Sequence, residues 1–378
     1  MRKHQLFLVL IAACAAGVFA SPAHAAQAGG ADISVLTPKS QENRISIDYS
    51  AWTGLLRDIV FNMGPSSRRR APTVDPDLGT RSVYGHDSPL RLEGNRVVFS
   101  QMSPEYIAAI TEYKNDLIAI GNEIDLTAMS RNEQLAFWLN LHNAITIEQI
   151  ALQYPVRKPS NIRVGPDGAK LNEAKLVTVK GVALSLNDIR TRIVYKNWSA
   201  PKVIYGFFRG DIGGPSIRNE AYTASNVSRL LDKNAVEYVN SLRGVTDTSQ
   251  VLLVSSVYKE ARPYFFEDWP NALRTHLRDY LKPEIADSLN LGAPVRFRSY
   301  EDDIADLAGG ETGSSVASTQ VVDSFTGAPR DSGNISPQVT RVVREAIEKR
   351  REQLARGEYN TTVTIEDVPS APEGEEVE

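Results

Sequence analysis

One segment, residues 132–155 (NEQLAFWLNLHNAITIEQIALQYP), constrains the fold more than any other part of the chain. Its apolar residues recur at helical spacing and also fill the flanks, so nearly the whole circumference of the predicted helix is apolar. Such a helix has to lie inside a sizeable core. Its polar members are Asn140, His142, Asn143 and Glu148. They need partners, because an unpaired buried polar group costs about 1–3 kcal/mol. They form either a structural hydrogen-bond network or a functional site.

The first 25 residues have the pattern of an export signal. Arg2 and Lys3 form a positive region, an apolar run follows, and residues 23–25 (Ala-His-Ala) fit a small-x-small cleavage site. The apolar run is too short for a membrane span. In the alternative, residues 11–14 act as a lipoprotein box and Cys14 is lipidated. We therefore expect a periplasmic or secreted protein, with a lipid-anchored form as the alternative.

Cysteine and histidine usage limits the chemistry. Cys14 is the single cysteine, so the chain after residue 25 has no thiol for a disulfide, a nucleophile or a metal ligand. The remaining histidines, His86, His142 and His276, show no metal-ligand spacing, and we expect neither a metal nor another cofactor. His276 is predicted on an exposed helix face. The net charge of −4 becomes −6 without the two basic residues of the export signal, which argues against nucleic acid as the partner.

The chain is predicted to have six segments. They are an export signal (1–25), a disordered segment (26–44), a folded domain (45–307), a flexible linker (308–335), an amphipathic helix (336–357) and an acidic tail (358–378). The helix 336–357 has a narrow apolar stripe. It packs on the main domain, self-associates or binds a protein partner.

Local patterns within residues 45–307 predict a mixture of helices and strands. Helices are expected at 49–63, 103–121, 130–154, 185–189, 225–242 and 270–280. Strands are expected at 97–100, 175–179, 182–184, 203–208, 251–255 and 295–300. The order lacks regular βαβ alternation, so we predict a single α+β domain with a central antiparallel sheet and packed helices.

The glycine-rich loop after residues 203–208 is a second candidate site. Its glycines would let backbone amides approach a ligand, and Arg209 and Asp211 offer a charge pair. The alternative is a tight turn that needs glycine. His142 has two interpretations as well: a hydrogen-bonded core histidine, or a general base that would need a nucleophile from elsewhere.

The segment Glu133–Ala144 (EQLAFWLNLHNA) resembles the signature of the family called domain of unknown function 547. In that family Ala-Phe-Trp is followed by an apolar residue, Asn, Tyr or His, and Asn-Ala. Further stretches similar to the family follow in order at 181–189, 212–215, 221–224, 254–258 and 300–303. The resemblance spans about residues 45–307.

The resemblance implies a papain- or transglutaminase-like architecture, in which a cysteine and a histidine face each other. Many members carry cysteines where this chain has Arg209 and Gly214, and a frequent histidine where it has Glu148. Their Ile-Glu-His is here Ile189-Arg190-Thr191. The thiol chemistry that this architecture would support is therefore absent, since the nucleophile must be a thiolate.

We therefore expect a non-catalytic module that binds a small anionic ligand or a peptide between the apolar helix and the glycine loop. The expected contacts are Trp138, Asn140, Asn143, Arg190, Arg209, Gly213 and Gly214. One alternative is a hydrolase that uses His142, Glu148 and Asp211; another is a structural envelope protein. Convergence of those three side chains on a cleft would favour the hydrolase. A Glu148–Arg209 salt bridge would argue against it.

Overall fold

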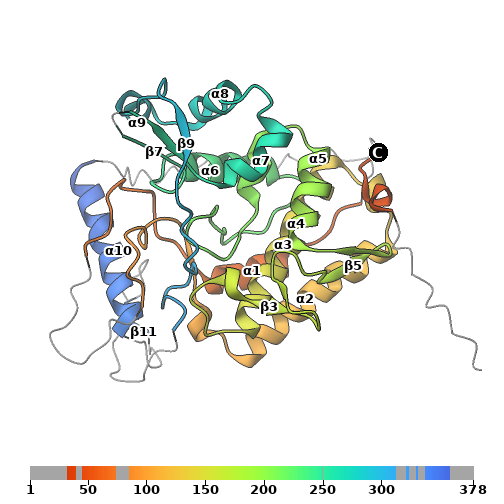
Figure 1. The fold of residues 1–378 in the computed structure, drawn as a ribbon. Coiled ribbons are helices and arrows are strands. Elements are labelled where there is room, and N and C mark those ends of the chain that lie inside the picture. Colours follow the sequence, from red (N-terminus) through yellow and green to blue (C-terminus); the bar gives the residue numbers. More distant parts are fainter. Residues whose placement is uncertain are drawn as a thin grey trace, which may run out of the picture. The chain divides into compact units, whose positions relative to one another are not determined.

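The apolar segment forms α3 (Arg131–Leu152) in the computed structural model of the chain, and every residue from Glu133 to Glu148 is buried. Ser130 is its N-cap and accepts a hydrogen bond from the Glu133 amide at 3.2 Å. The Glu133 carboxylate accepts a hydrogen bond from Ile47 N at 3.0 Å. α3 packs against α2 (Pro104–Glu123) and α6 (Val227–Val239), as Figure 1 illustrates. This confirms that α3 is a core helix.

The structure describes residues 32–39, 45–73, 85–248, 250–311, 321–322, 329–330 and 337–357. All of them belong to a unit of residues Ala31–Glu378, separate from Met1–Gly30. The predicted export signal, with Cys14, and the predicted acidic tail lie outside the described residues. Within the segment predicted as disordered, Ile33–Leu36 forms a 3₁₀ helix, η1, with Leu36 buried.

The described chain is mostly helical and carries small, separate sheets. The other α-helices are α1 (Ser50–Ile59), α4 (Leu186–Asp188), α5 (Tyr195–Asn197), α7 (Val257–Phe265), α8 (Asn271–Tyr280), α9 (Pro283–Ser288) and α10 (Pro337–Ala355). The other 3₁₀ helices are η2 (Phe99–Gln101), η3 (Leu126–Ala128), η4 (Pro159–Asn161) and η6 (Pro201–Gly206), and a π-helix, η5 (Ile189–Val194), links α4 to α5.

The strands pair in twos and threes. The two-stranded antiparallel pairs are β1 (Val60–Phe61) with β2 (Arg96–Val97), β3 (Arg163–Val164) with β4 (Ala169–Lys170), β5 (Val177–Val179) with β6 (Val182–Leu184), and β10 (Val321–Val322) with β11 (Pro329–Arg330). The largest sheet among the described residues has three strands: β7 (Val245–Asp247), antiparallel to β8 (Leu252–Val254), which is parallel to β9 (Val295–Phe297). The α+β prediction holds at this level, but the predicted central antiparallel sheet is wrong, because α3 occupies the centre of the core.

The predicted hairpin at 175–184 is confirmed as β5–β6. Its two turn residues, Lys180 and Gly181, both have positive φ (51° and 77°), as a two-residue type I′ turn requires. The predicted strand at 203–208 is wrong, since residues Pro201–Gly206 coil into η6. Its backbone is bonded by asparagine side chains rather than by a neighbouring strand: Asn234 Nδ2 donates to Tyr205 O at 2.9 Å.

α10 forms within the predicted helix 336–357 and packs on the main unit, the first of the three possibilities for its apolar stripe. Val339 and Val342 are buried in a small cluster with Met63 and Leu307. The Arg91 guanidinium binds Glu345 of α10 at 2.7 and 2.8 Å. Residue 336, the first of the predicted helix, lies outside the described residues.

Candidate functional site

The two signature asparagines of α3 fix the backbone that follows in the fold. Asn140 Nδ2 donates to Tyr222 O at 2.7 Å, and its Oδ1 accepts from Tyr222 N at 3.0 Å. Asn143 Nδ2 donates to Gly206 O and its Oδ1 accepts from Phe208 N, both at 3.0 Å. Because residues 206–208 lack a strand partner, these amides take the place of a sheet ladder. They set the position of Arg209, the next residue.

His142 is fully buried, and its hydrogen bonds determine its tautomer. Its Nε2 lies 3.1 Å from Arg190 Nη1, and its Nδ1 lies 3.2 Å from Asn143 Oδ1. A guanidinium can only donate, so Nε2 carries the lone pair and Nδ1 carries the proton. Burial lowers the pKa of His142 well below its usual value, and the charge of Arg190 lowers it further. The ring is therefore neutral, with its basic nitrogen already engaged.

Arg190 and Arg209 share one carboxylate, that of Glu260 on α7. Arg190 binds it through Nε and Nη2, each at 3.1 Å, and Arg209 through Nη2 at 2.7 Å and Nη1 at 3.2 Å. Burial would raise the pKa of Glu260, but the two guanidinium charges hold it well below its usual range. Arg190 Nη2 also donates to Asn172 Oδ1 at 2.6 Å. The cluster holds two positive charges against one negative charge, with the Arg190 side chain buried and those of Arg209 and Glu260 partly buried.

Asp211 lies at the start of the glycine loop. Its Oδ1 accepts hydrogen bonds from Tyr300 Oη at 2.6 Å and from Gly214 N at 2.9 Å. Burial raises the pKa of Asp211 to about 6, although the Tyr300 hydrogen bond and the charge of Arg209 lower it. Asp211 can therefore change its charge near neutral pH.

These groups meet at a cavity of about 210 Å³. Its wall includes His142, Thr146, Asn172, Arg190, Arg209, Asp211 and Tyr300, and residues 159–160, 170–171, 173 and 186 complete it. His142, Thr146 and Arg190 form buried parts of this wall, whereas Lys170, Asn172 and Glu173 are exposed. The cavity lies between α3, η5 and the glycine loop, where the sequence predicts a pocket.

The remaining predicted site residues lie away from this cavity. Glu148 pairs with Lys114 at 2.6 Å, and not with Arg209. Trp138 is fully buried and packs edge-to-face on Phe137. The Glu148–Arg209 salt bridge that would argue against a hydrolase is therefore not formed. The convergence that would favour a hydrolase is incomplete, because His142 and Asp211 share a cavity but Glu148 does not line it.

Gly213 and Gly214 serve packing at the edge of the site. The Gly213 amide donates to Glu301 O at 2.8 Å, and a Cβ on Gly213 would lie 2.6 Å from that oxygen. A Cβ on Gly214 would lie 3.0 Å from Asp211 Oδ1. Both glycines let the loop approach residues 300–301, and their amides are directed at the chain itself.

Two further histidines are buried. His276 is 6 % exposed, and its Nε2 lies 2.8 Å from Tyr205 Oη, so the predicted exposed helix face is wrong. His86 Nε2 lies 2.5 Å from Asp306 O. Within the described part of the chain, His, Cys, Asp and Glu side chains do not gather in threes that could hold a metal ion. No helix in that part is long and apolar enough to span a bilayer.

The fold and the cavity define a class: a mostly helical α+β protein in which a buried arginine, Arg190, and a partly buried one, Arg209, line a small cavity beside a signature-bearing core helix. Residues 126–239 match the family model described as "Protein of unknown function, DUF547". The chain thus contains a DUF547 family domain, from η3 to the end of α6, as the resemblance implies. No curated protein and no solved structure was found to match the chain.

Sequence reasoning missed two residues that complete the site, Glu260 and Tyr300. Both lie outside the matched residues 126–239. Tyr300 opens the last stretch similar to the family, which was a usable signal. Glu260 lies two residues beyond the stretch 254–258, and nothing in the sequence distinguishes it from other surface acids.

Proposed function

We propose that this protein is a non-catalytic module that binds a small carboxylate-bearing molecule, or the carboxylate end of a peptide, in the cavity beside Arg190 and Arg209. The observation that carries the proposal is the partly buried cluster of two arginines on one carboxylate, with both arginines on the cavity wall. Each arginine already binds Glu260 through two nitrogens, so a ligand carboxylate is attracted by the positive charge that Glu260 leaves uncompensated.

The charge of the wall supports an anionic ligand. Glu260 neutralises one of the two guanidinium charges, and His142 adds no charge because its pKa is lowered. Asp211, with a pKa of about 6, carries little negative charge in mildly acidic solution. In mildly acidic solution one positive charge therefore remains in a cavity whose inner wall is buried, where an anion gains more than it would in water.

The cavity volume supports a small ligand. Ligand pockets for drug-sized molecules measure roughly 300–1,000 Å³, whereas this one measures about 210 Å³. A group the size of one amino acid fits this space. A longer peptide would continue past the exposed residues Lys170, Asn172 and Glu173.

The papain- or transglutaminase-like architecture belongs to the same proposal. Arg209, at a cysteine position of the resembled family, lines one cavity with His142. We interpret the site as one where arginine has replaced a thiol, so that a binding group stands where a nucleophile would.

A hydrolase is the second candidate, because His142 and Asp211 both line the cavity. The hydrogen bond from Arg190 to His142 Nε2 opposes it, since the base would have to break that bond to accept a proton. Turnover of an ester, thioester or peptide by the purified protein, lost on His142→Ala, would establish the hydrolase and end the binding proposal.

Export to the periplasm or beyond is part of the proposal, supported by the signal-like residues 1–25, with lipidation at Cys14 as the alternative. A purely structural envelope role is the remaining alternative. It would leave the cavity without any ligand.

Calorimetry and thermal unfolding with matched ligands test the proposal. We expect N-acetylalanine and alanyl-alanine to raise the unfolding temperature and their C-terminal amides not to do so, because a ligand stabilises the state that binds it. Arg209→Gln should weaken binding about ten-fold or more, since hydrogen bonds to a charged group contribute about 1.5–3 kcal/mol.

Arg192→Gln is the matched control. Arg192 lies two residues from Arg190 on η5, but its side chain is 53 % exposed and pairs with Asp188. It should bind like the wild type. Equal shifts with acids and amides, or no shift with either, contradict the proposal.

A further inference from the structure

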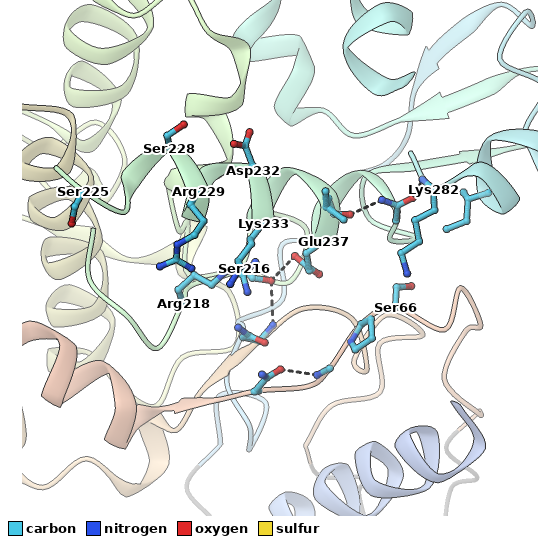
Figure 2. Close-up of a pocket in the computed structure, with 17 residues that line it drawn as sticks. Ser66, Ser216, Arg218, Ser225, Ser228, Arg229, Asp232, Lys233, Glu237 and Lys282 are labelled. Atoms are coloured by element: carbon cyan, nitrogen blue, oxygen red, sulfur yellow. Dashed lines mark hydrogen bonds between the residues drawn. The ribbon is translucent and has the colours of Figure 1, made fainter. Parts of the chain in front are cut away.

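A larger cavity of about 820 Å³ forms a groove along the solvent-facing side of α6 (Figure 2). The helix buries Leu230, Leu231 and Tyr238 in the core. Positions three and four apart on its other side, among them Arg229, Asp232 and Val236, line the groove. This groove is separate from the cavity at Arg190 and does not rest on the function proposed there.

The acids that line the groove are neutralised by bases that do not line it. Asp232 pairs with Lys202 at 2.9 Å. Glu237 pairs with Arg243 and accepts a hydrogen bond from Ser216 at 3.0 Å. Neither carboxylate is therefore free to neutralise the cations of the groove.

Three of the four lining cations have no carboxylate partner among the described residues. Arg229 pairs with Glu220 at 3.1 Å. Arg218 donates to the neutral amide of Asn234, and the side chains of Lys233 and Lys282 are exposed. The groove thus carries surplus positive charge.

The arrangement of these cations suits an extended ligand. Figure 2 shows Arg218 and Arg229 toward one end of the groove, Lys282 toward the other end near Ser66, and Lys233 between them. Apolar surface separates the charges: Val236 is 38 % exposed, and Ile285 and Pro65 also line the groove. A chain that alternates acidic and apolar residues matches this pattern better than a compact anion does.

The last turns of α10 lie beside the groove. Arg350 Nη2 donates to Asn62 O at 2.5 Å, and Gln353 Nε2 donates to Pro65 O at 3.5 Å. Asn62 and Pro65 both line the groove. The sequence that continues after Gly357 carries seven carboxylates and no lysine or arginine over residues 358–378.

We propose that the groove along α6 is a binding site for an acidic peptide segment and that its occupant is residues 358–378 of the same chain. The motif Ile-Glu-Asp-Val at 365–368 places two acidic residues between two apolar ones, so it offers both kinds of side chain that the groove suits. An extended chain covers about 3.3–3.6 Å per residue, so this segment is long enough to run along the groove. Tethering raises its effective concentration to roughly millimolar, which keeps other acidic peptides out.

Fluorescence anisotropy with a labelled peptide of sequence 358–378 tests this proposal. The two proteins compared are the wild type and a variant whose tail is neutralised. The substitutions are Glu358→Gln, Glu366→Gln, Asp367→Asn, Glu373→Gln, Glu375→Gln, Glu376→Gln and Glu378→Gln. We expect the peptide to bind the neutralised-tail protein about ten-fold more tightly or better, because the native tail no longer competes. Added salt should weaken this binding.

Charge reversal in the groove provides the second comparison. Lys233→Glu with Lys282→Glu, placed in the neutralised-tail protein, should weaken peptide binding about ten-fold or more. Lys259→Glu, an exposed lysine of α7 outside the groove, should leave it unchanged. Unfolding temperatures of all variants establish that they fold.

Several results overturn the proposal. Equal affinity of the peptide for wild type and neutralised-tail protein shows that the native tail does not occupy the groove. If the peptide binds neither the wild type nor the neutralised-tail protein, the groove is not an acidic-peptide site. Equal binding of a peptide with amides in place of its acids excludes such a site as well. Binding of inorganic polyphosphate that needs Lys233 and Lys282, without peptide binding, assigns the groove to phosphate chains instead.

Discussion

At the scale of single residues, the polar side chains of α3 divide by the direction of their hydrogen bonds. The side chains of Asn140 and Asn143 form their hydrogen bonds with backbone groups of residues 206, 208 and 222. His142 directs one nitrogen at Asn143 and the other at Arg190, which places it on the cavity wall. The predicted hydrogen-bond network is therefore present, and it borders the cavity of the candidate site.

Asp211 provides a pH prediction at this scale. Its pKa in the folded protein is about 6, above the ordinary 3.8, because of burial. Because the folded-state pKa is raised, protonated Asp211 contributes stability that is fully present below the unfolded-state pKa of 3.8. This contribution is lost as the pH rises through about 6. An anion in the cavity likewise prefers protonated Asp211, so affinity for N-acetylalanine should fall roughly three-fold or more between about pH 5 and about pH 7.

Calorimetry at both pH values measures this change, since the ligand carboxylate is ionised throughout. Asp211→Asn should flatten the profile, whereas Asp116→Asn, on the exposed side of α2, should not. A wild-type affinity that is constant or rises with pH contradicts the assignment.

Sequence reasoning found the polar residues of the core helix but not all of their partners. A buried polar group in an apolar helix is visible in the sequence because it breaks the pattern. Its partner is not visible when it lies far along the chain: Glu260 is 51 residues from Arg209, and Tyr300 is 89 residues from Asp211. Both contacts depend on the tertiary fold.

At the scale of elements, the sequence predicted helix starts and a turn correctly where neighbouring residues alone determine them. N-cap residues Ser103 and Ser130 begin α2 and α3, and a two-residue turn closes β5–β6. The segment 203–208 failed because a short apolar run does not distinguish a strand from a buried helical turn. Asparagine amides from α3 and α6 decide its conformation.

Gly213 gives an element-scale prediction for the loop after η6. A Cβ there would meet the Glu301 carbonyl oxygen at 2.6 Å and Glu301 N at 3.0 Å, which are backbone atoms that cannot turn aside. Gly213→Ala should destabilise the fold by about 1–3 kcal/mol, as overpacking does. Urea unfolding measures this change.

Gly54 of α1 is the matched control, since a Cβ there would meet no heavy atom within 4 Å. Gly54→Ala should stabilise the protein by about 0.5–1 kcal/mol, because alanine loses less entropy in a helix. The two substitutions should thus change the free energy of unfolding in opposite directions. A Gly213→Ala protein as stable as wild type would show that the loop does not pack on residue 301.

At the scale of the whole molecule, α10 joins the last described helix to residues 62–65 and 91–92 of the N-terminal half. Arg91 is 1 % exposed in its side chain and is held by Glu345. Lys349 Nζ donates to Leu92 O at 2.8 Å, and burial lowers the pKa of Lys349 to about 8. Arg350 and Gln353 of the same helix donate to Asn62 O and Pro65 O, and both of these residues line the α6 groove.

Glu345→Gln tests this connection. It leaves the Arg91 guanidinium buried without its anion, and breaking a buried ion pair in this way costs about 3–5 kcal/mol. The hydrogen bonds from Arg91 to Pro72 O and Ser88 O remain, which favours the lower end of that range. Hydrogen exchange should show faster exchange of α10 amides while α3 stays protected, because α3 does not depend on this contact.

Glu348→Gln, one turn further along α10, serves as its control. Its partner Arg351 is 73 % exposed, Glu348 itself is 62 % exposed, and such pairs contribute about 0–1 kcal/mol. If the groove wall depends on α10, Glu345→Gln should also weaken binding of the 358–378 peptide in the neutralised-tail protein, and Glu348→Gln should not. Equal effects of the two substitutions on exchange would mean that α10 rests on its apolar contacts with Met63 and Leu307 rather than on Arg91.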